Sequence, residues 1–247
     1  MSTYFHITYE FSPERALERI AEQCRTSPAG YVCVADGNVL VQVHRDTEYR
    51  QIVQGALFSI CDSSWVPLYL QRLYGFKPRQ YSGSDIFRDI TEAKRYRMAF
   101  LGASQEVLDA LRVQMTAVDP RIGSMFFEAL PYADADTFDY AAIAEAVNAE
   151  DPDIVWVALG APKQERFAAR LAPLLKRGVV IPVGAVFNFR SGLAIRRAPK
   201  WMVQCHLEFL YRLFREPRKQ FRRVWQILRW TPAILREERR TIQNRQY

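Results

Sequence analysis

The stretch 155–189 constrains the fold more than any other part of the sequence. It contains an apolar run at 155–159, a turn at Gly160, a helical segment that extends to Arg177, and a second apolar run at 179–183. A strand, a helix and a second strand in this order form a βαβ unit, and such units build parallel sheets with helices on their faces. Ligands of open parallel sheets bind at the carboxyl ends of the strands. The sequence therefore predicts a functional site where these two apolar runs end.

The rest of the chain repeats this alternation of strands and helices. Ser12 followed by Pro13 predicts the start of a helix that runs to about Thr26. We expect further strands at 31–35, 56–61 and 98–101, and helices at 39–54, 68–74, 103–113 and 141–149, with another helix beginning at 83–85. This pattern predicts an α/β fold, a doubly wound, mostly parallel Rossmann-like sheet with a basic helical C-terminal appendage. We assign residues 1–195 to the catalytic domain and 196–247 to the appendage.

The positive charge of the chain is concentrated in this appendage. Residues 1–195 contain 20 Lys/Arg and 23 Asp/Glu, a net charge of −3, whereas residues 196–247 contain 14 and 4, a net charge of +10. Such asymmetry predicts an acidic partner surface at one end of the molecule, either nucleic acid or anionic lipid. At 221–230 aromatic residues alternate with arginines, which favours a helix in a membrane interface. Aromatic residues before Pro217 are expected to pack on the domain, and Pro232 to break or kink the helix.

Several classes of protein and site are excluded or disfavoured. No apolar run reaches the ~18 residues of a membrane-spanning helix, and the first residues lack a signal-peptide pattern, so we expect a cytoplasmic protein. The four Cys and three His residues have no metal-ligand spacing. P-loop, GxGxxG and GxSxG motifs are absent. Asp134 with Asp136, and Asp151 with Asp153, match a metal-binding Asp-x-Asp pattern, but neither pair directly follows a predicted strand, so we expect no metal and no cofactor.

Polar residues and glycines that follow the predicted strands are expected to meet at one edge of the sheet. These candidate substrate-binding residues are Asp36, Asn38, Gly102, Lys163, Gln164, Glu165, Gly184 and Asn188. Asp62 is the candidate general base, because it follows an apolar strand where partial loss of solvent raises the basicity of a carboxylate. The alternative for Asp62 is a solvated aspartate that caps the next helix.

The sequence resembles the WecG/TagA/CpsF glycosyltransferase family, also called glycosyltransferase family 26. The resemblance is carried by RDTEYR at 45–50, Asp62, GSD at 83–85, LGAPKQE at 159–165, VGAVFNF at 183–189 with Ser191 and Gly192, RAPKW at 197–201, LEFLYRL at 207–213 and EPR at 216–218. These motifs occur in the family's order and cover most of the chain. Their combination is more specific than any one of them.

This resemblance implies an inverting transferase of bacterial surface polysaccharide synthesis that needs no metal. Such an enzyme moves a hexosyl or N-acetylhexosaminyl group from a UDP-sugar to a polyprenyl-diphosphate-linked sugar at the inner face of the plasma membrane. The resemblance implies that Asp62 is the base and that Gln164 lines the pocket, and it adds Gly83 and Asp85 to the substrate-binding set. Arginines of the appendage would complete the site over the donor diphosphate, and we select Arg212, Arg215, Arg218 and Arg222. We expect a peripheral membrane protein that binds no nucleic acid, with a homo-oligomer as an alternative to a monomer.

The sequence departs from the family pattern at several positions. Asp36 stands where asparagine is usual, Ser63 replaces a glycine, Asn188 replaces an aspartate, and Cys205-His206 occupies a place that normally contains glycine. The change at Asn188 motivates one alternative, an inactive relative that acts as a scaffold. The basic appendage motivates another, a nucleic-acid-binding module. The acidic body and the lack of an RNA-binding signature favour the transferase.

Overall fold

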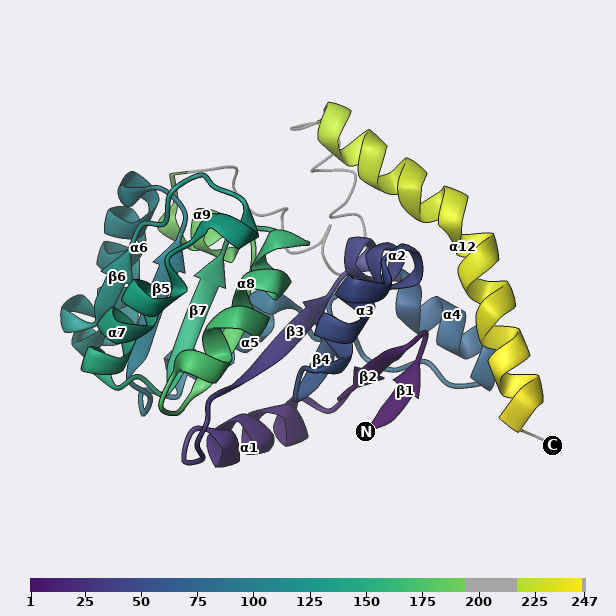
Figure 1. The fold of residues 1–247 in the computed structure, drawn as a ribbon, viewed down its shortest axis with the longest axis horizontal. Coiled ribbons are helices and arrows are strands. Elements are labelled where there is room, and N and C mark those ends of the chain that lie inside the picture. The colour runs from purple at the N-terminus through teal and green to yellow at the C-terminus, as the bar shows by residue number, and fades with distance from the viewer. Residues whose placement is uncertain (194–216, 246–247) are drawn as a thin grey trace.

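The computed structural model describes residues 1–193 and 217–245, which form one mixed sheet with helices on both faces (Figure 1). The strand order is β1-β2-β4-β3-β8-β7-β5-β6. β1 is antiparallel to β2, and the other neighbouring strands are parallel. The predicted doubly wound, mostly parallel α/β fold is confirmed.

The bounds of the elements follow the chain in order. The strands are β1 (Ser2–Tyr4), β2 (Ile7–Tyr9), β3 (Gly30–Ala35), β4 (Phe58–Cys61), β5 (Met98–Gly102), β6 (Phe126–Glu128), β7 (Ile154–Ala158) and β8 (Val179–Pro182). The α-helices are α1 (Pro13–Gln23), α2 (Gly37–Arg45), α3 (Thr47–Gln54), α4 (Trp65–Tyr74), α5 (Gly83–Glu92), α6 (Gln105–Val118), α7 (Tyr140–Glu150), α8 (Lys163–Leu171), α9 (Val186–Ser191) and α12 (Pro217–Arg245). Short 3-10 helices occur at η1 (Pro120–Ser124), η2 (Ala135–Thr137) and η3 (Ala172–Leu174).

The core lies on both faces of the sheet because side chains alternate along each strand. Val34 of β3 packs with α1, α5, α6 and α9 on one face, whereas Cys33 packs with α2, α3 and α4 on the other. Trp156 and Val157 of β7 divide in the same way, with α7 and α8 on the side of Val157. Strands covered on both faces are apolar at nearly every position. This explains the continuous apolar runs in the sequence.

Three predicted elements differ from the observed ones. The single helix predicted over 39–54 is two helices, because Asp46 ends α2 and its Oδ1 accepts a hydrogen bond from the Tyr49 amide at 3.0 Å to begin α3. The helical segment predicted to extend to Arg177 ends earlier, because α8 stops at Leu171 and is followed by the 3-10 helix η3. Residues 187–189 belong to the short helix α9. The helix predicted over 103–113 is α6, which begins at Gln105, after the cap residue Ser104, and extends to Val118. The N-terminal hairpin of β1 and β2 was not predicted, because three-residue strands carry little periodicity.

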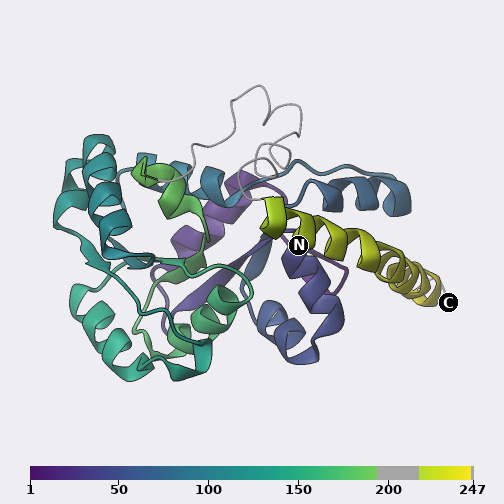
Figure 2. The same ribbon diagram turned by 90° about the horizontal axis from the view of Figure 1, so that it is seen from above.

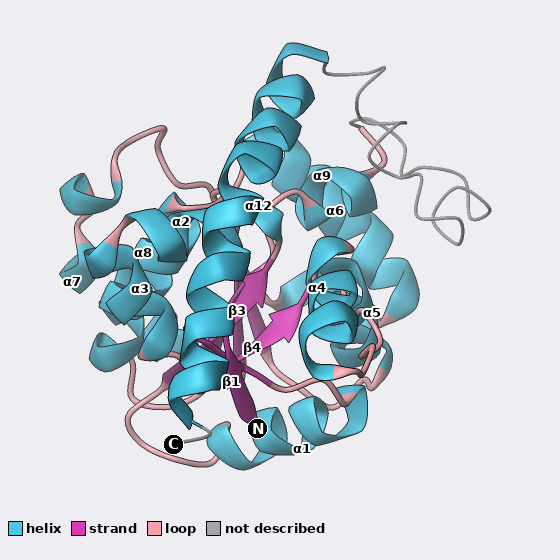
Figure 3. Cartoon of the chain, turned by 90° about the vertical axis from the view of Figure 1, so that its right-hand side faces the viewer, coloured by secondary structure: helices cyan, strands magenta, loops and turns pink. Residues whose placement is uncertain are grey.

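The basic C-terminal segment contains the long helix α12, which crosses the sheet edge formed by β1 and β2 (Figures 1 and 2). Seen from that side, α12 lies in front of the sheet between α2 and α4 (Figure 3). Pro232 does not break this helix. The axis changes direction part-way along (Figure 1), as expected where a proline removes one backbone hydrogen bond. The predicted boundary between residues 195 and 196 lies outside the described residues.

Candidate active site

The carboxyl ends of the parallel strands bring most of the predicted residues to one edge of the sheet. β3 and β8 are neighbours at the centre of the sheet, and the helices that follow them, α2 and α9, lie on opposite faces, as they do at a switch point of a doubly wound sheet. Ala35 pairs with Cys61 at the ends of β3 and β4, and the Asp62 amide donates to the Ala35 carbonyl at 3.1 Å. Asp36 and Asp62 therefore leave adjacent strands at the same level.

Asp62 is half-buried between two buried residues, Cys61 and Ser63. Its carbonyl accepts a hydrogen bond from the Gln80 side chain at 3.1 Å. The helix that follows, α4, is capped by its neighbour: the Ser63 hydroxyl accepts from the amides of Trp65 and Val66 at 3.2 and 3.4 Å. The capping role considered for Asp62 is thus filled by Ser63.

Asp36 is the N-cap of α2. Its Oδ1 accepts hydrogen bonds from the amides of Asn38 and Val39 at 2.8 and 2.9 Å. The turn is crowded from outside, since a Cβ on Gly37 would lie 2.7 Å from Cδ1 of Ile227 in α12 and 3.9 Å from the Ser63 hydroxyl. Helix α12 therefore packs directly on the turn that carries Asp36 and Asn38.

The β7–α8 connection forms the next part of the edge. Gly160 adopts a φ of +78°, which favours glycine, and its amide donates to Oε1 of the buried Gln164 side chain at 3.1 Å. The Gln164 Nε2 donates to Oε1 of Glu165 at 2.8 Å. A Cβ on Gly184, just after β8, would lie 3.5 Å from the Gln164 Oε1. The Gln164 side chain therefore bonds to the connection after β7 and lies close to the residue that follows β8.

Glu165 is completely buried. Burial raises the pKa of its carboxyl from 4.5 to about 7, against the opposing effects of the Gln164 hydrogen bond and the nearby Tyr49 hydroxyl; the negative charge of Asp36 raises it further. The Tyr49 hydroxyl lies close enough to lower this pKa, yet it does not meet the geometry of a hydrogen bond with Glu165. Sequence reasoning identified Glu165 but missed Tyr49, which reaches it from α3.

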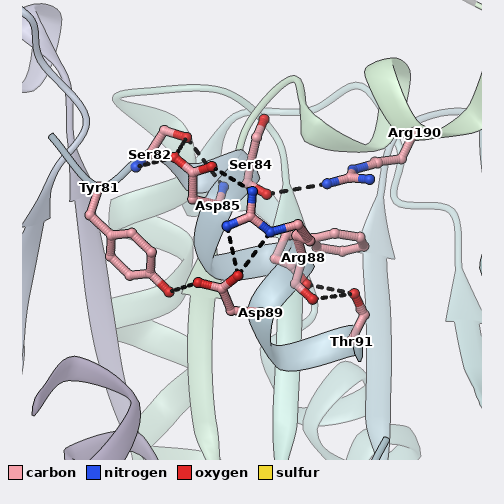
Figure 4. Close-up of polar contacts among 9 residues, drawn as sticks. Tyr81, Ser82, Ser84, Asp85, Arg88, Asp89, Thr91 and Arg190 are labelled. Atoms are coloured by element: carbon pink, nitrogen blue, oxygen red, sulfur yellow. Dashed lines mark hydrogen bonds and ion pairs between the residues drawn. The ribbon is translucent and has the colours of Figure 1, made fainter. Parts of the chain in front are cut away.

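The Gly83–Asp85 motif starts helix α5 (Figure 4). The Asp85 carboxylate accepts from the Ser82 amide and the Ser82 hydroxyl accepts from the Asp85 amide, each at 3.2 Å, which forms a capping box. The carboxylate also accepts from the Ser82 hydroxyl at 2.6 Å and from Arg88 at 3.1 Å. Arg190 of α9 donates to the Ser84 carbonyl at 3.4 Å. A Cβ on Gly83 would lie 3.3 Å from Cγ1 of Val34, so this motif holds α5 close to the ends of β3 and β8.

The remaining predicted residues are more widely spread. Lys163 turns toward the loop after β6, where its ammonium donates to the Ala133 carbonyl at 3.0 Å and lies 5.0 Å from the ring centroid of Tyr132. Asn188 is half-buried in α9. Gly102 allows close contact between β5 and β7, because a Cβ there would lie 2.8 Å from the Ala158 carbonyl oxygen. Arg218 and Arg222 lie in the first turns of α12, whereas Arg212 and Arg215 lie outside the described residues.

The sequence is similar to known proteins over most of its length. The model of the glycosyl transferase WecG/TagA/CpsF family matches residues 5–244. The chain belongs to this family. It is similar to the N-acetylglucosaminyldiphosphoundecaprenol N-acetyl-beta-D-mannosaminyltransferase of Bacillus spizizenii, with 29% identity over 85% of this chain and 80% of the relative. The protein of the same name from Bacillus subtilis is 27% identical over 79% of this chain and 75% of its own length.

Two departures from the pattern of the WecG/TagA/CpsF family have a structural account. Asp36 and Ser63 each cap a helix that starts at the edge of the sheet, at α2 and α4. Ala35, directly before Asp36, pairs with Cys61, two residues before Ser63, at the ends of β3 and β4. The structure gives no comparable account of Asn188.

Three of the four aspartates of the two Asp-x-Asp pairs are paired with arginines. Asp151 and Asp153 precede β7, at the opposite edge of the sheet from Asp62, and both accept from Arg177 at 2.7 Å. Asp136 is paired with Arg170. Within residues 1–193 and 217–245, no group of three or more His, Cys, Asp or Glu side chains has the arrangement of a metal site.

Helix α12 has two apolar stripes. Ile227, Trp230 and Ile234 pack on the core beside α2 and α4. Phe221, Trp225 and Leu228, spaced by four and three residues on another side, are 67%, 51% and 53% exposed. The prediction that residues 221–230 meet a membrane interface therefore fits only the second stripe. No helix in the described part of the chain combines the length and the apolar composition needed to cross a bilayer.

The acidic residues of α12 face the body of the protein. Glu237 contacts Nε2 of His6 and Nδ1 of His44, each at 2.6 Å. Glu238, which is buried, accepts from the Phe5 amide at 2.9 Å and from the Tyr74 hydroxyl at 2.5 Å. Helix α12 contains eight arginines and one lysine, and Glu237 and Glu238 are its two acidic residues. Arg229, Arg236, Arg239 and Arg240 are exposed, so the outer side of this part of α12 is basic.

Proposed function

We propose that this protein is an inverting glycosyltransferase that moves an N-acetylhexosaminyl group from a UDP-sugar to a polyprenyl-diphosphate-linked sugar. The observation that carries the proposal is the position of Asp62, a half-buried carboxylate at the carboxyl end of β4. The following helix, α4, starts with its Trp65 and Val66 amides bonded to the Ser63 hydroxyl. The names of the Bacillus relatives support a diphosphoundecaprenol-linked acceptor and an N-acetylmannosaminyl donor group.

In the proposed reaction Asp62 is the general base. Its carboxylate takes the proton from the acceptor hydroxyl while the acceptor oxygen forms a bond to the anomeric carbon of the donor. The bond from that carbon to the diphosphate oxygen breaks on the opposite side, and UDP leaves with the bonding electrons. This geometry inverts the anomeric configuration. The departing diphosphate requires compensating positive charge.

We assign that positive charge to arginines of the appendage rather than to a metal. Ile227 brings α12 against Gly37, in the turn between Asp36 and Asn38, so the basic helix lies beside the sheet edge that carries Asp62. Arg218 and Arg222 lie on the same helix, nearer its N-terminal end. Guanidinium groups bind phosphate oxygens in pairs of hydrogen bonds. The engagement of Asp136 by Arg170, and of Asp151 and Asp153 by Arg177, supports metal independence.

We further propose that α12 holds the enzyme on the inner face of the plasma membrane. The exposed stripe of Phe221, Trp225 and Leu228 would enter the interface, and the surrounding arginines would attract anionic lipid headgroups. The lipid-linked acceptor would then meet the sheet edge without leaving the membrane. This arrangement gives the described part of the chain, in which no helix is long and apolar enough to cross a bilayer, access to a membrane-bound substrate.

The substitution Asp62→Asn tests the proposal. It keeps the shape of the side chain but removes the base, so turnover with a synthetic lipid-diphosphate sugar should fall by roughly 10²–10⁴. UDP affinity and the urea unfolding midpoint should stay unchanged. Asp109→Asn, at an exposed position of α6, is the matched control and should keep native turnover. Native turnover in Asp62→Asn would refute the role of this residue.

A further inference from the structure

The side chain of Gln164 has two nearly isosteric orientations, related by exchange of its oxygen and nitrogen. In the structure its Oε1 faces the Gly160 amide and its Nε2 faces Glu165. The reversed orientation would place Nε2 against the Gly160 N–H, donor against donor. It would also place Oε1 against a carboxylate. Two neighbours with opposite requirements therefore select one orientation.

Within the described residues the Glu165 carboxyl group has two close polar side chains beside it, the Gln164 amide and the Tyr49 hydroxyl. Its Oε1 accepts only the Gln164 bond among the described residues, and its Oε2 has no hydrogen-bond partner there. The Tyr49 hydroxyl beside it is likewise buried without a hydrogen-bond partner in the described part of the chain. An apolar residue would fill this space without the cost of burying a carboxyl group. The hydrogen bond that this carboxyl group accepts in the described part of the chain is the one that orients Gln164.

We propose that Glu165 is a positioning residue of the active site, which holds the Gln164 amide in the orientation that accepts the hydrogen bond of the Gly160 amide, in the connection after β7. The inference rests on the proposed function, since it assumes that this edge of the sheet binds the donor sugar. Gln164 lies between Gly160 and Gly184, at the ends of two central strands. Without the acceptor oxygen of Glu165, Gln164 loses its orientation and Gly160 loses its acceptor. Glu165 itself does not touch the donor.

A double-mutant cycle on kcat/KM tests whether Glu165 acts through Gln164. Glu165→Met removes the acceptor, and Gln164→Ala removes the amide; each should lower kcat/KM about 10-fold, the loss expected from one hydrogen bond to a charged group. If Glu165 acts through Gln164, the double variant should also lose about 10-fold. A loss of about 100-fold would mean independent roles and would overturn the proposal. Glu165→Gln keeps an acceptor oxygen and should restore near-native kcat/KM.

Hydrogen exchange at the Gly160 amide tests the same contact without any substrate. Exchange should be at least 10-fold faster in Glu165→Met and Gln164→Ala than in the native protein, and unchanged in Glu165→Gln. Native protection in a folded Glu165→Met protein would overturn the proposal. A native protein that transfers no sugar yet shows this pattern would refute the proposed function and leave the positioning contact established.

The contact can also be followed in proteins that keep their fold. The side-chain NH₂ resonances of Gln164 should shift as Glu165 ionises in the native protein, and should stay fixed over the same pH range in Glu165→Gln. Resonances that respond identically in the two proteins would overturn the proposal even if Glu165→Met did not fold.

Discussion

Replacing Glu165 with glutamine should stabilise the protein at alkaline pH and have little effect near pH 4.5. The folded protein holds the Glu165 proton with a pKa of about 7, whereas the unfolded chain releases it near 4.5. Below pH 4.5 both states are protonated and burial of the neutral group costs little. As the pH rises, the unfolded state loses its proton first, so native stability falls until the folded state also ionises above pH 7. Glutamine cannot ionise, so the Glu165→Gln protein does not lose this stability as the pH rises.

The size of the effect follows from the difference between the two pKa values. That difference, 7 minus 4.5, is 2.5 units, which corresponds to about 3 kcal/mol at 1.36 kcal/mol per unit. Urea unfolding at several pH values between 5 and 8.5 should show Glu165→Gln gaining most of this amount relative to the native protein. Glu145→Gln, at an exposed position of α7, is the control and should show no such trend. A stability difference for Glu165→Gln that does not change with pH would refute the reasoning.

Three further predictions concern the metal, the membrane and the anchoring of α12. Transfer should persist in excess EDTA and in the double variant Asp134→Ala, Asp136→Ala; loss on chelation that Mg²⁺ or Mn²⁺ restores would contradict metal independence. Binding to anionic vesicles should weaken between 0.1 and 1 M salt, as the Debye length falls from ~10 to ~3 Å, and the residual binding should disappear when the half-exposed Trp225 and Leu228 become serine; sedimentation equal to the native protein would contradict this. Glu238→Ala leaves the Phe5 amide without its acceptor and should cost about 1–3 kcal/mol in urea unfolding, so an unchanged midpoint would exclude the anchoring role.

Local patterns in the sequence determined the class of fold and much of the edge of the sheet. Continuous apolar runs such as 154–157 mark strands covered on both faces, and their order predicts parallel pairing. Asp36 and Asp62 were identified because each directly follows such a run. Ser12 and Pro13 fixed the start of α1 for a local reason as well, since a cap depends on neighbouring amides. These features could be predicted because they depend on residues close together in the chain.

The electrostatic state of Glu165 was decided by tertiary structure alone. In the sequence it ends a polar cluster, Lys163-Gln164-Glu165, that is typical of a solvated helix start. In the fold Lys163 separates from the other two side chains and reaches the loop after β6, while Glu165 turns inward beside Tyr49 of α3 and stays hydrogen-bonded to Gln164. The packing of α3 against α8, which places Tyr49 beside Glu165, helps to remove water from that carboxyl group.

Helix α12 shows the same division between sequence and structure. Its sequence contains two apolar stripes, one with Phe221 and Trp225 and one with Ile227 and Ile234, and either is apolar enough to be the packed side. Contact with α2 and α4 decides that the stripe with Ile227 and Ile234 is the packed one. Burial of Glu238 follows from the same choice, because it lies on the packed side and meets the Phe5 amide there. Periodicity specifies which residues share a face of a helix, but only the shape and hydrogen-bonding groups of the neighbouring surface determine which face is buried.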